Sequence, residues 1–136
     1  MPQLSIKSDA RGIRVKLKEG QDTISECKIS ILDNIWSVSE WYTYNTYKHK
    51  GYGNAVMKEA LSRLYKEHGE PDEIRYIWNG VNAYVMDWLI KHFDPVSILP
   101  LEVQKTSETD VWEAHIYILN KEKVLEHFEV KDQPNL

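Results

Sequence analysis

The sequence runs Tyr47-Lys48-His49-Lys50-Gly51-Tyr52-Gly53-Asn54 at the point where a predicted strand gives way to a predicted helix. A helix N-terminus carries unpaired backbone N–H groups and the positive end of the helix dipole, and both suit phosphate oxygens. Gly51 and Gly53 lack a Cβ, so they let the backbone approach a diphosphate closely and tolerate positive φ. The stretch therefore predicts a phosphate-binding turn. A glycine-rich surface loop with a solvated basic triplet is the alternative interpretation.

The residues on either side of this turn have different periodicities. Ile35 to Thr43 is typical of a strand, whereas apolar residues recur at helical spacing between about Gly53 and His68. The residues expected to face inward on this helix are Ala55, Val56, Ala60, Leu61 and Leu64. Gly69 ends the helix, and Glu73 to Trp78 is typical of a further strand. The order strand, helix, strand predicts a right-handed crossover between parallel strands.

The remaining segments extend this unit on both sides. Ile13 to Lys18 and Thr23 to Ile31 alternate apolar and polar residues, and Asp33-Asn34 is typical of a tight turn before the third run. These runs predict an antiparallel meander. Four elements are expected after the crossover: a helix from about Asn82 to His92, strands at Val96–Gln104 and Val111–Leu119, and a short helix at Lys121–Phe128 capped by Asn120.

Length and composition limit the class of protein. The 136 residues suit a single domain, 1–136, with one core. The formal net charge of −4 disfavours a general nucleic-acid binder, which usually carries a basic face or a high pI. No apolar run approaches the roughly 20 residues of a membrane-spanning helix. The lone Cys27 and the absence of a visible secretory signal favour a cytoplasmic protein, and the scattered histidines predict no metal site.

The central stretch resembles the signature of the GNAT N-acetyltransferase superfamily, Arg/Gln-x-x-Gly-x-Gly/Ala, which opens the helix after the fourth strand. This chain has Lys48 in place of the usual Arg or Gln, followed by Gly51 and Gly53. A second, looser similarity covers Asn79 to Phe93, where His92 replaces the usual Gly. The two blocks together cover roughly Ile35 to Phe93.

The resemblance implies an α+β fold, a three-layer α/β arrangement around a GNAT-like mixed, mostly antiparallel sheet with a central β-α-β crossover. It also implies that the fourth and fifth strands splay apart and admit the pantetheine arm of acetyl-CoA, the expected cosubstrate. The residues expected to bind acetyl-CoA are Tyr42, Thr43, Tyr44, Lys48, His49, Lys50, Gly51, Tyr52, Gly53, Asn54, Asn79 and Asn82.

The implied reaction is acetyl transfer to a primary amine of an unidentified acceptor. Glu40 is the candidate base that takes the amine proton, and a solvent-facing strand residue is its alternative interpretation. Trp88 occupies the position where the family usually has its acidic Tyr, so Tyr84, one turn earlier, is the candidate acid. Because both assignments depend on the resemblance, a non-catalytic acyl-CoA-binding or regulatory module with the same fold remains the alternative function.

The N-terminal segment departs from the family pattern. Family members usually have one or two helices between their first two strands, but only about 10 residues lie between Ser5 and Val15, too few for a helix beside the turn at Arg11-Gly12. The resemblance therefore implies an acceptor side that is open or completed by another chain, as in a homodimer. An open side favours a protein or peptide amine over an enclosed metabolite.

Overall fold

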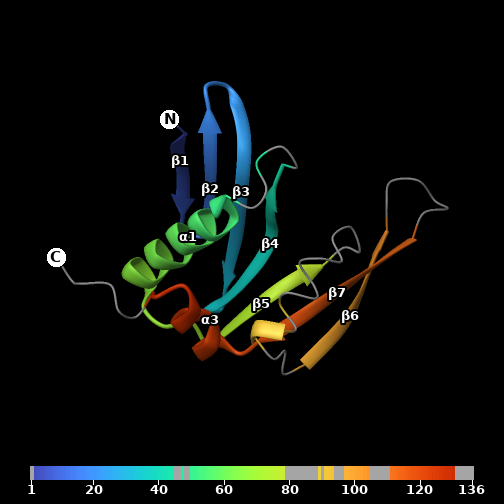
Figure 1. The fold of residues 1–136 in the computed structure, drawn as a ribbon. Coiled ribbons are helices and arrows are strands. Elements are labelled where there is room, and N and C mark those ends of the chain that lie inside the picture. The colour runs from blue at the N-terminus through green and yellow to red at the C-terminus, as the bar shows by residue number, and fades with distance from the viewer. Residues whose placement is uncertain are drawn as a thin grey trace.

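The strand-helix-strand unit forms the middle of a seven-stranded mixed sheet (Figure 1). A computed structural model describes residues 2–44, 47, 50–78, 89, 91–93, 97–104 and 111–130. The strands are β1 (Gln3–Asp9), β2 (Gly12–Glu19), β3 (Asp22–Leu32), β4 (Ile35–Thr43), β5 (Glu73–Trp78), β6 (Ser97–Gln104) and β7 (Val111–Leu119). The helices that lie wholly within the described residues are α1 (Tyr52–His68) and α3 (Lys121–His127).

The strand order is β1-β2-β3-β4-β5-β7-β6, and only the β4–β5 pair is parallel. The mixed, mostly antiparallel sheet with a central crossover is confirmed, and α1 is the crossover element. Two tight turns explain the antiparallel half. Asp33 and Asn34 both have positive φ, 52° and 60°, which suits the twist of a two-residue hairpin loop. Only Ala10 and Arg11 separate β1 from β2, so the expected lack of a helix there is confirmed.

The strands β4 and β5 stop pairing about halfway along β4. Their pairing begins at Ile35 with Glu73 and ends at Val38 with Tyr76. The pairing of β4 with β3, by contrast, continues to Thr43. The predicted splay of the fourth and fifth strands is therefore confirmed, and Figure 1 shows β4 turning away from β5 toward the start of α1.

The helices α1 and α3 lie over the same face of the sheet (Figure 1). Trp41 connects the two, because its indole bonds to the first turn of α1 and its ring lies 6.3 Å from that of Phe128, next to α3. Lys58 of α1 pairs with Glu129 at 3.5 Å. We call this side the covered face. Among the described residues, no helix lies over the opposite side of β1–β4, which we call the bare face.

The core lies between α1 and the covered face. The helix buries Val56, Met57, Ala60, Leu61 and Leu64. The expectation that Ala55 faces inward is wrong, since Ala55 is exposed and Met57 is buried instead. The buried residues of α1 follow the spacing i, i+1, i+4, i+5 and i+8, and Ala55 lies outside this stripe.

The sequence located most boundaries to within a residue or two. The strands Ile35–Thr43, Glu73–Trp78 and Val111–Leu119 have the predicted bounds. The strand β1 was not delimited from the sequence, because Gln3–Asp9 has weak alternation at the sheet edge. The predicted cap of α3 is confirmed, since the Asn120 side chain accepts a hydrogen bond from the Lys123 N–H at 3.2 Å.

Candidate functional site

A β-bulge marks the point where β4 leaves β5. Lys28 of β3 pairs with Glu40 and Ile29 pairs with Val38, so Ser39 is an extra residue in β4. A bulge bends its strand and increases the local twist. Ser39 directly follows the last β4 residue paired with β5, so the bulge is in a position to produce the splay. The Ser39 hydroxyl is buried and has no hydrogen-bond partner among the described residues.

The far half of β4 has one paired edge and one open edge. The Tyr44 N–H donates to the Ile24 carbonyl of β3 at 3.0 Å. Because residues alternate in an antiparallel ladder, the backbone groups of Thr43 then point away from β3, toward the side that β5 has left. Buried backbone groups require partners. This edge is therefore suited to an extended ligand with amide groups.

The N-terminus of α1 lies beside this open edge and has no side-chain cap. Gly51 is the N-cap residue, with φ 78° and ψ 9°, a left-handed conformation that favours glycine. No acidic residue occupies the first turn. Within the described part of the chain, no backbone hydrogen bond is donated by the N–H groups of Tyr52, Gly53 or Asn54. Three main-chain donors at the positive end of a 17-residue helix form an anion-binding arrangement.

The second glycine has a packing role. The Trp41 indole N–H donates to the Gly53 carbonyl at 2.8 Å. A Cβ on Gly53 would lie 3.2 Å from the Thr43 hydroxyl and 3.6 Å from the Trp41 indole nitrogen. Gly53 therefore lets α1 approach β4 closely, whereas a Cβ on Gly51 would meet nothing within 4 Å. The sequence analysis assigned both glycines to the phosphate-binding turn, but their roles differ. Gly51 provides the left-handed N-cap conformation, and Gly53 allows α1 to pack closely on β4.

Aromatic rings and one cation surround the helix start. The rings of Tyr47 and Tyr52 lie 6.4 Å apart, and the Lys50 ammonium lies 6.0 Å from the Tyr47 ring centroid. Lys50 is exposed, so its charge is available near the three amides that have no backbone partner among the described residues. This arrangement adds a cation to the anion-binding geometry.

Glu40 lies on the bare face, immediately after the bulge. Its carboxylate is 43% exposed and lies 3.8 Å from the Arg14 guanidinium. A hydrogen bond from Glu26 lowers the pKa of Glu40, and the nearby cations of Arg14 and Lys28 act in the same direction. The group is therefore ionised at neutral pH, as a proton acceptor must be.

Glu26 is the partner that sequence reasoning missed. It is only 4% exposed, and it lies 3.6 Å from the Lys16 ammonium. Burial raises the pKa of Glu26, and the hydrogen bond with Glu40 adds to this effect, while Arg14 and Lys16 act in the opposite direction. Glu26 therefore holds its proton more strongly than Glu40 does, and the two side chains form a carboxyl pair. The pattern of alternation in β3 predicted a polar residue here but not its burial.

The tyrosines at the end of β4 also lie on the bare face. The rings of Tyr42 and Tyr44 are 5.4 Å apart in an edge-to-face arrangement. Burial, followed by the negative charge of Glu26, raises the pKa of Tyr42 to about 12. Tyr42 keeps its proton at neutral pH and can act as a hydrogen-bond donor. The Thr43 hydroxyl lies instead on the covered face, 2.9 Å from the Ser25 hydroxyl.

The structure brings part of the expected site together. Tyr42, Thr43 and Tyr44 lie on one strand end, and the residues from Lys50 to Asn54 surround the start of α1. The other expected site residues lie outside the described residues: Lys48, His49, Asn79, Asn82 and the candidate acid Tyr84, together with Trp88. Sequence reasoning missed Ser39, Trp41 and Glu26.

Two other kinds of site are not found among the described residues. Within those ranges, no group of three His, Cys, Asp or Glu side chains is placed to hold a metal ion. No helix in the same part of the chain is long and apolar enough to cross a membrane.

Burial raises the pKa of the Cys27 thiol, whose sulfur lies 3.7 Å from that of Met57, so this cysteine is an inert core residue.

Comparison with known proteins identifies the fold. No family model and no curated protein sequence matches the chain. Among solved structures, a GNAT family acetyltransferase from Elizabethkingia anophelis with acetyl-CoA bound is 8% identical, with 87% of this chain and 96% of that chain covered and a TM-score of 0.57. A Bacillus subtilis acetyltransferase in complex with CoA is 10% identical, with 88% and 99% covered and a TM-score of 0.56.

A third solved structure is similar over a smaller part of its own length. It is the ribosomal-protein-S18-alanine N-acetyltransferase from Escherichia coli, which is 13% identical, with 82% of this chain and 70% of that chain covered and a TM-score of 0.57. At these identities the similarity concerns the fold. The chain has the GNAT acetyltransferase fold.

Proposed function

We propose that this chain, with its GNAT acetyltransferase fold, is an N-acetyltransferase that moves an acetyl group from acetyl-CoA to a primary amine. One observation carries the proposal: a strand edge freed by the bulge at Ser39 leads to the uncapped start of α1. An edge that offers amide partners, followed by an anion site, matches a ligand with an amide-containing arm and a diphosphate. Coenzyme A has both parts in that order.

The chain's own residues would hold the cosubstrate at two places. The N–H groups of Tyr52, Gly53 and Asn54 would bind the diphosphate, with the Lys50 ammonium nearby. The open edge at Thr43 would hydrogen-bond the pantetheine amides. The bond from Trp41 to the Gly53 carbonyl fixes the distance between these two places, because it ties the helix start to β4.

The reaction requires a proton acceptor and a leaving-group donor. The amine nitrogen attacks the thioester carbonyl carbon, a C–N bond forms, the C–S bond breaks, and coenzyme A leaves as a thiolate that takes up a proton. Glu40 accepts the proton that the amine loses, directly or through one water. Its hydrogen bond from Glu26 and its position after the bulge set its orientation. Tyr84 stays the proposed acid, and holding the two substrates together supplies much of the rate.

Calorimetry with acetyl-CoA tests the proposal at the anion site. Asn54 is exposed in the first turn of α1, where an acidic residue favours the helix, so Asn54→Glu preserves the fold. The added charge would face a bound diphosphate and raise the Kd for acetyl-CoA about tenfold or more. The matched control is Lys66→Gln, which makes the same change in net charge in the last turn of the helix and should leave Kd unchanged.

The catalytic part has a separate readout. Release of free thiol is measured with acetyl-CoA and a panel of peptides, polyamines and aminoglycosides. The proposal expects thiol release with at least one amine. If the folded protein gives no heat with acetyl-CoA, the coenzyme A site is wrong. If it binds acetyl-CoA but no amine in the panel releases thiol, the non-catalytic module is the better interpretation.

A further inference from the structure

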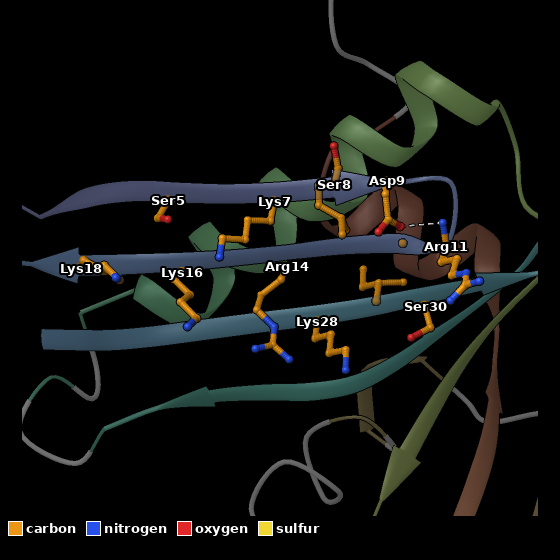
Figure 2. Close-up of a pocket in the computed structure, with 13 residues that line it drawn as sticks. Ser5, Lys7, Ser8, Asp9, Arg11, Arg14, Lys16, Lys18, Lys28 and Ser30 are labelled. Carbon is orange, nitrogen blue, oxygen red and sulfur yellow. Dashed lines mark hydrogen bonds between the residues drawn. The ribbon is translucent and has the colours of Figure 1, made fainter. Parts of the chain in front are cut away.

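A basic groove of about 480 Å³ lies on the bare face, over β1, β2 and β3 (Figure 2). Its lining includes six cationic side chains and one carboxylate, that of Asp9. The six cations are Lys7, Arg11, Arg14, Lys16, Lys18 and Lys28. Figure 2 shows them distributed over three neighbouring strands and the turn after β1. We call this surface the basic groove.

The strand register arranges three of these cations in a row. Lys7 pairs with Arg14, Arg14 pairs with Lys28, and Lys28 pairs with Glu40. Neighbouring strands lie about 4.8 Å apart, so the row extends about 14 Å from Glu40 to Lys7. The basic groove is therefore continuous with the position of the proposed proton acceptor.

The charge in the groove is poorly neutralised. The ammonium groups of Lys7 and Lys18 and the guanidinium of Arg11 have no carboxylate within 4 Å among the described residues, and Asp9 accepts a hydrogen bond from the Arg11 backbone N–H instead. Like charges directly opposite on a sheet are destabilising, yet Lys7 faces Arg14 and Arg14 faces Lys28.

The whole chain has the opposite sign. It carries 17 basic and 21 acidic residues, so 6 of its 17 cations line one groove of a net-negative molecule. A local field of this kind attracts anionic ligands.

The shape of the groove favours an extended polypeptide. Arg14, Lys16 and Lys18 repeat every second residue along β2, a spacing of about 6.7 Å. Alternate side chains of an extended peptide have the same spacing. Single-stranded nucleic acid is usually bound by aromatic stacking as well as by cations, and no aromatic side chain lines the groove in the described part of the chain.

We infer that the acceptor is an acidic polypeptide, which lies along the basic groove and presents its amine at Glu40. This inference depends on the proposed acetyltransferase function. A peptide that runs parallel to β2 has alternate side chains opposite Arg14, Lys16 and Lys18. Arg14 lies two strand spacings from Glu40, about 10 Å or three extended residues, so the acidic side chains begin about three residues from the acetylated amine. The hydroxyls of Ser5 and Ser30 in the same lining supply further donors for carboxylates.

Fluorescence anisotropy with labelled peptides, in the absence of acetyl-CoA, tests the groove. Three peptides share a free N-terminal alanine and a C-terminal fluorophore, and alternate alanine with Glu, Gln or Lys. We expect the Glu peptide to bind at least tenfold more tightly than the Gln peptide, with an affinity that falls as salt is added. An affinity for the Gln peptide equal to that for the Glu peptide would overturn the inference. So would tighter binding of a thymidine 20-mer than of the Glu peptide.

Charge reversal locates the binding. The variant Lys7→Glu/Lys18→Glu places one new carboxylate opposite Arg14, which favours the fold. This variant should weaken binding of the Glu peptide at least tenfold. The control Lys66→Glu/Lys91→Glu makes the same charge change on exposed helical residues and should change the affinity less than twofold. Equal effects of the two variants, or a change of oligomeric mass with the groove variant, would count against a peptide groove.

Thiol release separates this inference from the proposed function. With acetyl-CoA present, the Glu peptide should have a kcat/KM at least tenfold above that of the Gln peptide. Equal values for both peptides would refute the acidic acceptor and leave the acetyltransferase in place. Thiol release from acetyl-CoA with other amines but not with the Glu peptide would lead to the same conclusion. Binding of the Glu peptide without thiol release from any amine would contradict the proposed function and, with it, the acceptor role.

Discussion

The two faces of the β1–β4 sheet are built from alternate residues of the same strands and have opposite characters. On β2, Val15 is fully buried under α1, whereas the neighbouring Arg14 side chain is 37% exposed on the bare face. The covered face contains the core and lies against the helix start that we assign to coenzyme A. The bare face contains Glu40 and the basic groove. Under our proposal, one face holds the fold together and binds the cosubstrate, while the other face recognises the acceptor.

The largest effect on either face is expected when the proposed proton acceptor is removed. Glu40→Gln keeps the size of the side chain but removes its basicity, so kcat/KM for thiol release should fall about 10²- to 10⁴-fold. The Kd for acetyl-CoA should change little, because Glu40 lies on the opposite face from the start of α1. The control is Glu19→Gln at the exposed end of β2, which should retain full activity. An unchanged rate in Glu40→Gln would remove Glu40 from the mechanism.

The next effect concerns stability and should separate the two faces. Leu61 is fully buried between α1 and the sheet, so Leu61→Ala should lower the free energy of unfolding by about 2–5 kcal/mol. Lys18→Ala on the bare face should change it by less than about 0.5 kcal/mol. Urea denaturation measures both variants. A large loss of stability in Lys18→Ala would indicate that the basic groove has a structural role.

A smaller effect is expected where the covered face meets the proposed cosubstrate site. Trp41→Phe removes the hydrogen bond to the Gly53 carbonyl, a loss of about 1 kcal/mol, and retains the ring next to Phe128. We expect a few-fold higher Kd for acetyl-CoA, because the helix start is no longer tied to β4.

Trp36 provides the matched control for that measurement. The Trp36 indole N–H is buried without a hydrogen-bond partner among the described residues. Trp36→Phe therefore makes the same chemical change without breaking a hydrogen bond between described residues, and the Kd of the folded variant should stay unchanged. Equal shifts in both variants would show that general loosening of the core, rather than the bond to Gly53, changes the affinity.

The smallest effect is a pH dependence on the bare face. Because the pKa of Glu26 is raised from its ordinary 4.5, its contribution to stability is complete below that value and is lost as pH rises through the pKa of the folded state. Glu40 has a lowered pKa, so its contribution is present above 4.5 and is lost as pH falls.

The variant Glu26→Gln isolates the first of these two contributions. The stability of the natural chain relative to Glu26→Gln should decrease as pH rises from about 4 to about 7. Denaturation of both proteins across this range measures the difference. A difference that grows with pH would mean that Glu26 is favoured as an ion, contrary to the hydrogen bond that we assign from Glu26 to Glu40.

Local signals explain how much of the fold was predictable. Asp33-Asn34 between two alternating runs is sufficient for a hairpin, and Asn120 before a short amphipathic run is sufficient for a cap. The bulge at Ser39 gives no such signal, because the sequence of β4 alternates acceptably with or without an extra residue. The sequence alone therefore did not determine on which face of the sheet Glu40 lies. The register of β4 with β3 determines it.

The sequence by itself determined the order of elements, the glycine turn before the long helix and the lack of room for a helix between the first two strands, because each depends on neighbouring residues. Only the tertiary structure decided which side chains meet. The contact of Trp41 with Gly53, the carboxyl pair of Glu26 with Glu40 and the row of cations across β1, β2 and β3 join residues from separate segments. Such contacts depend on strand register and helix placement, which are set by the packing of the whole core rather than by any single stretch of chain.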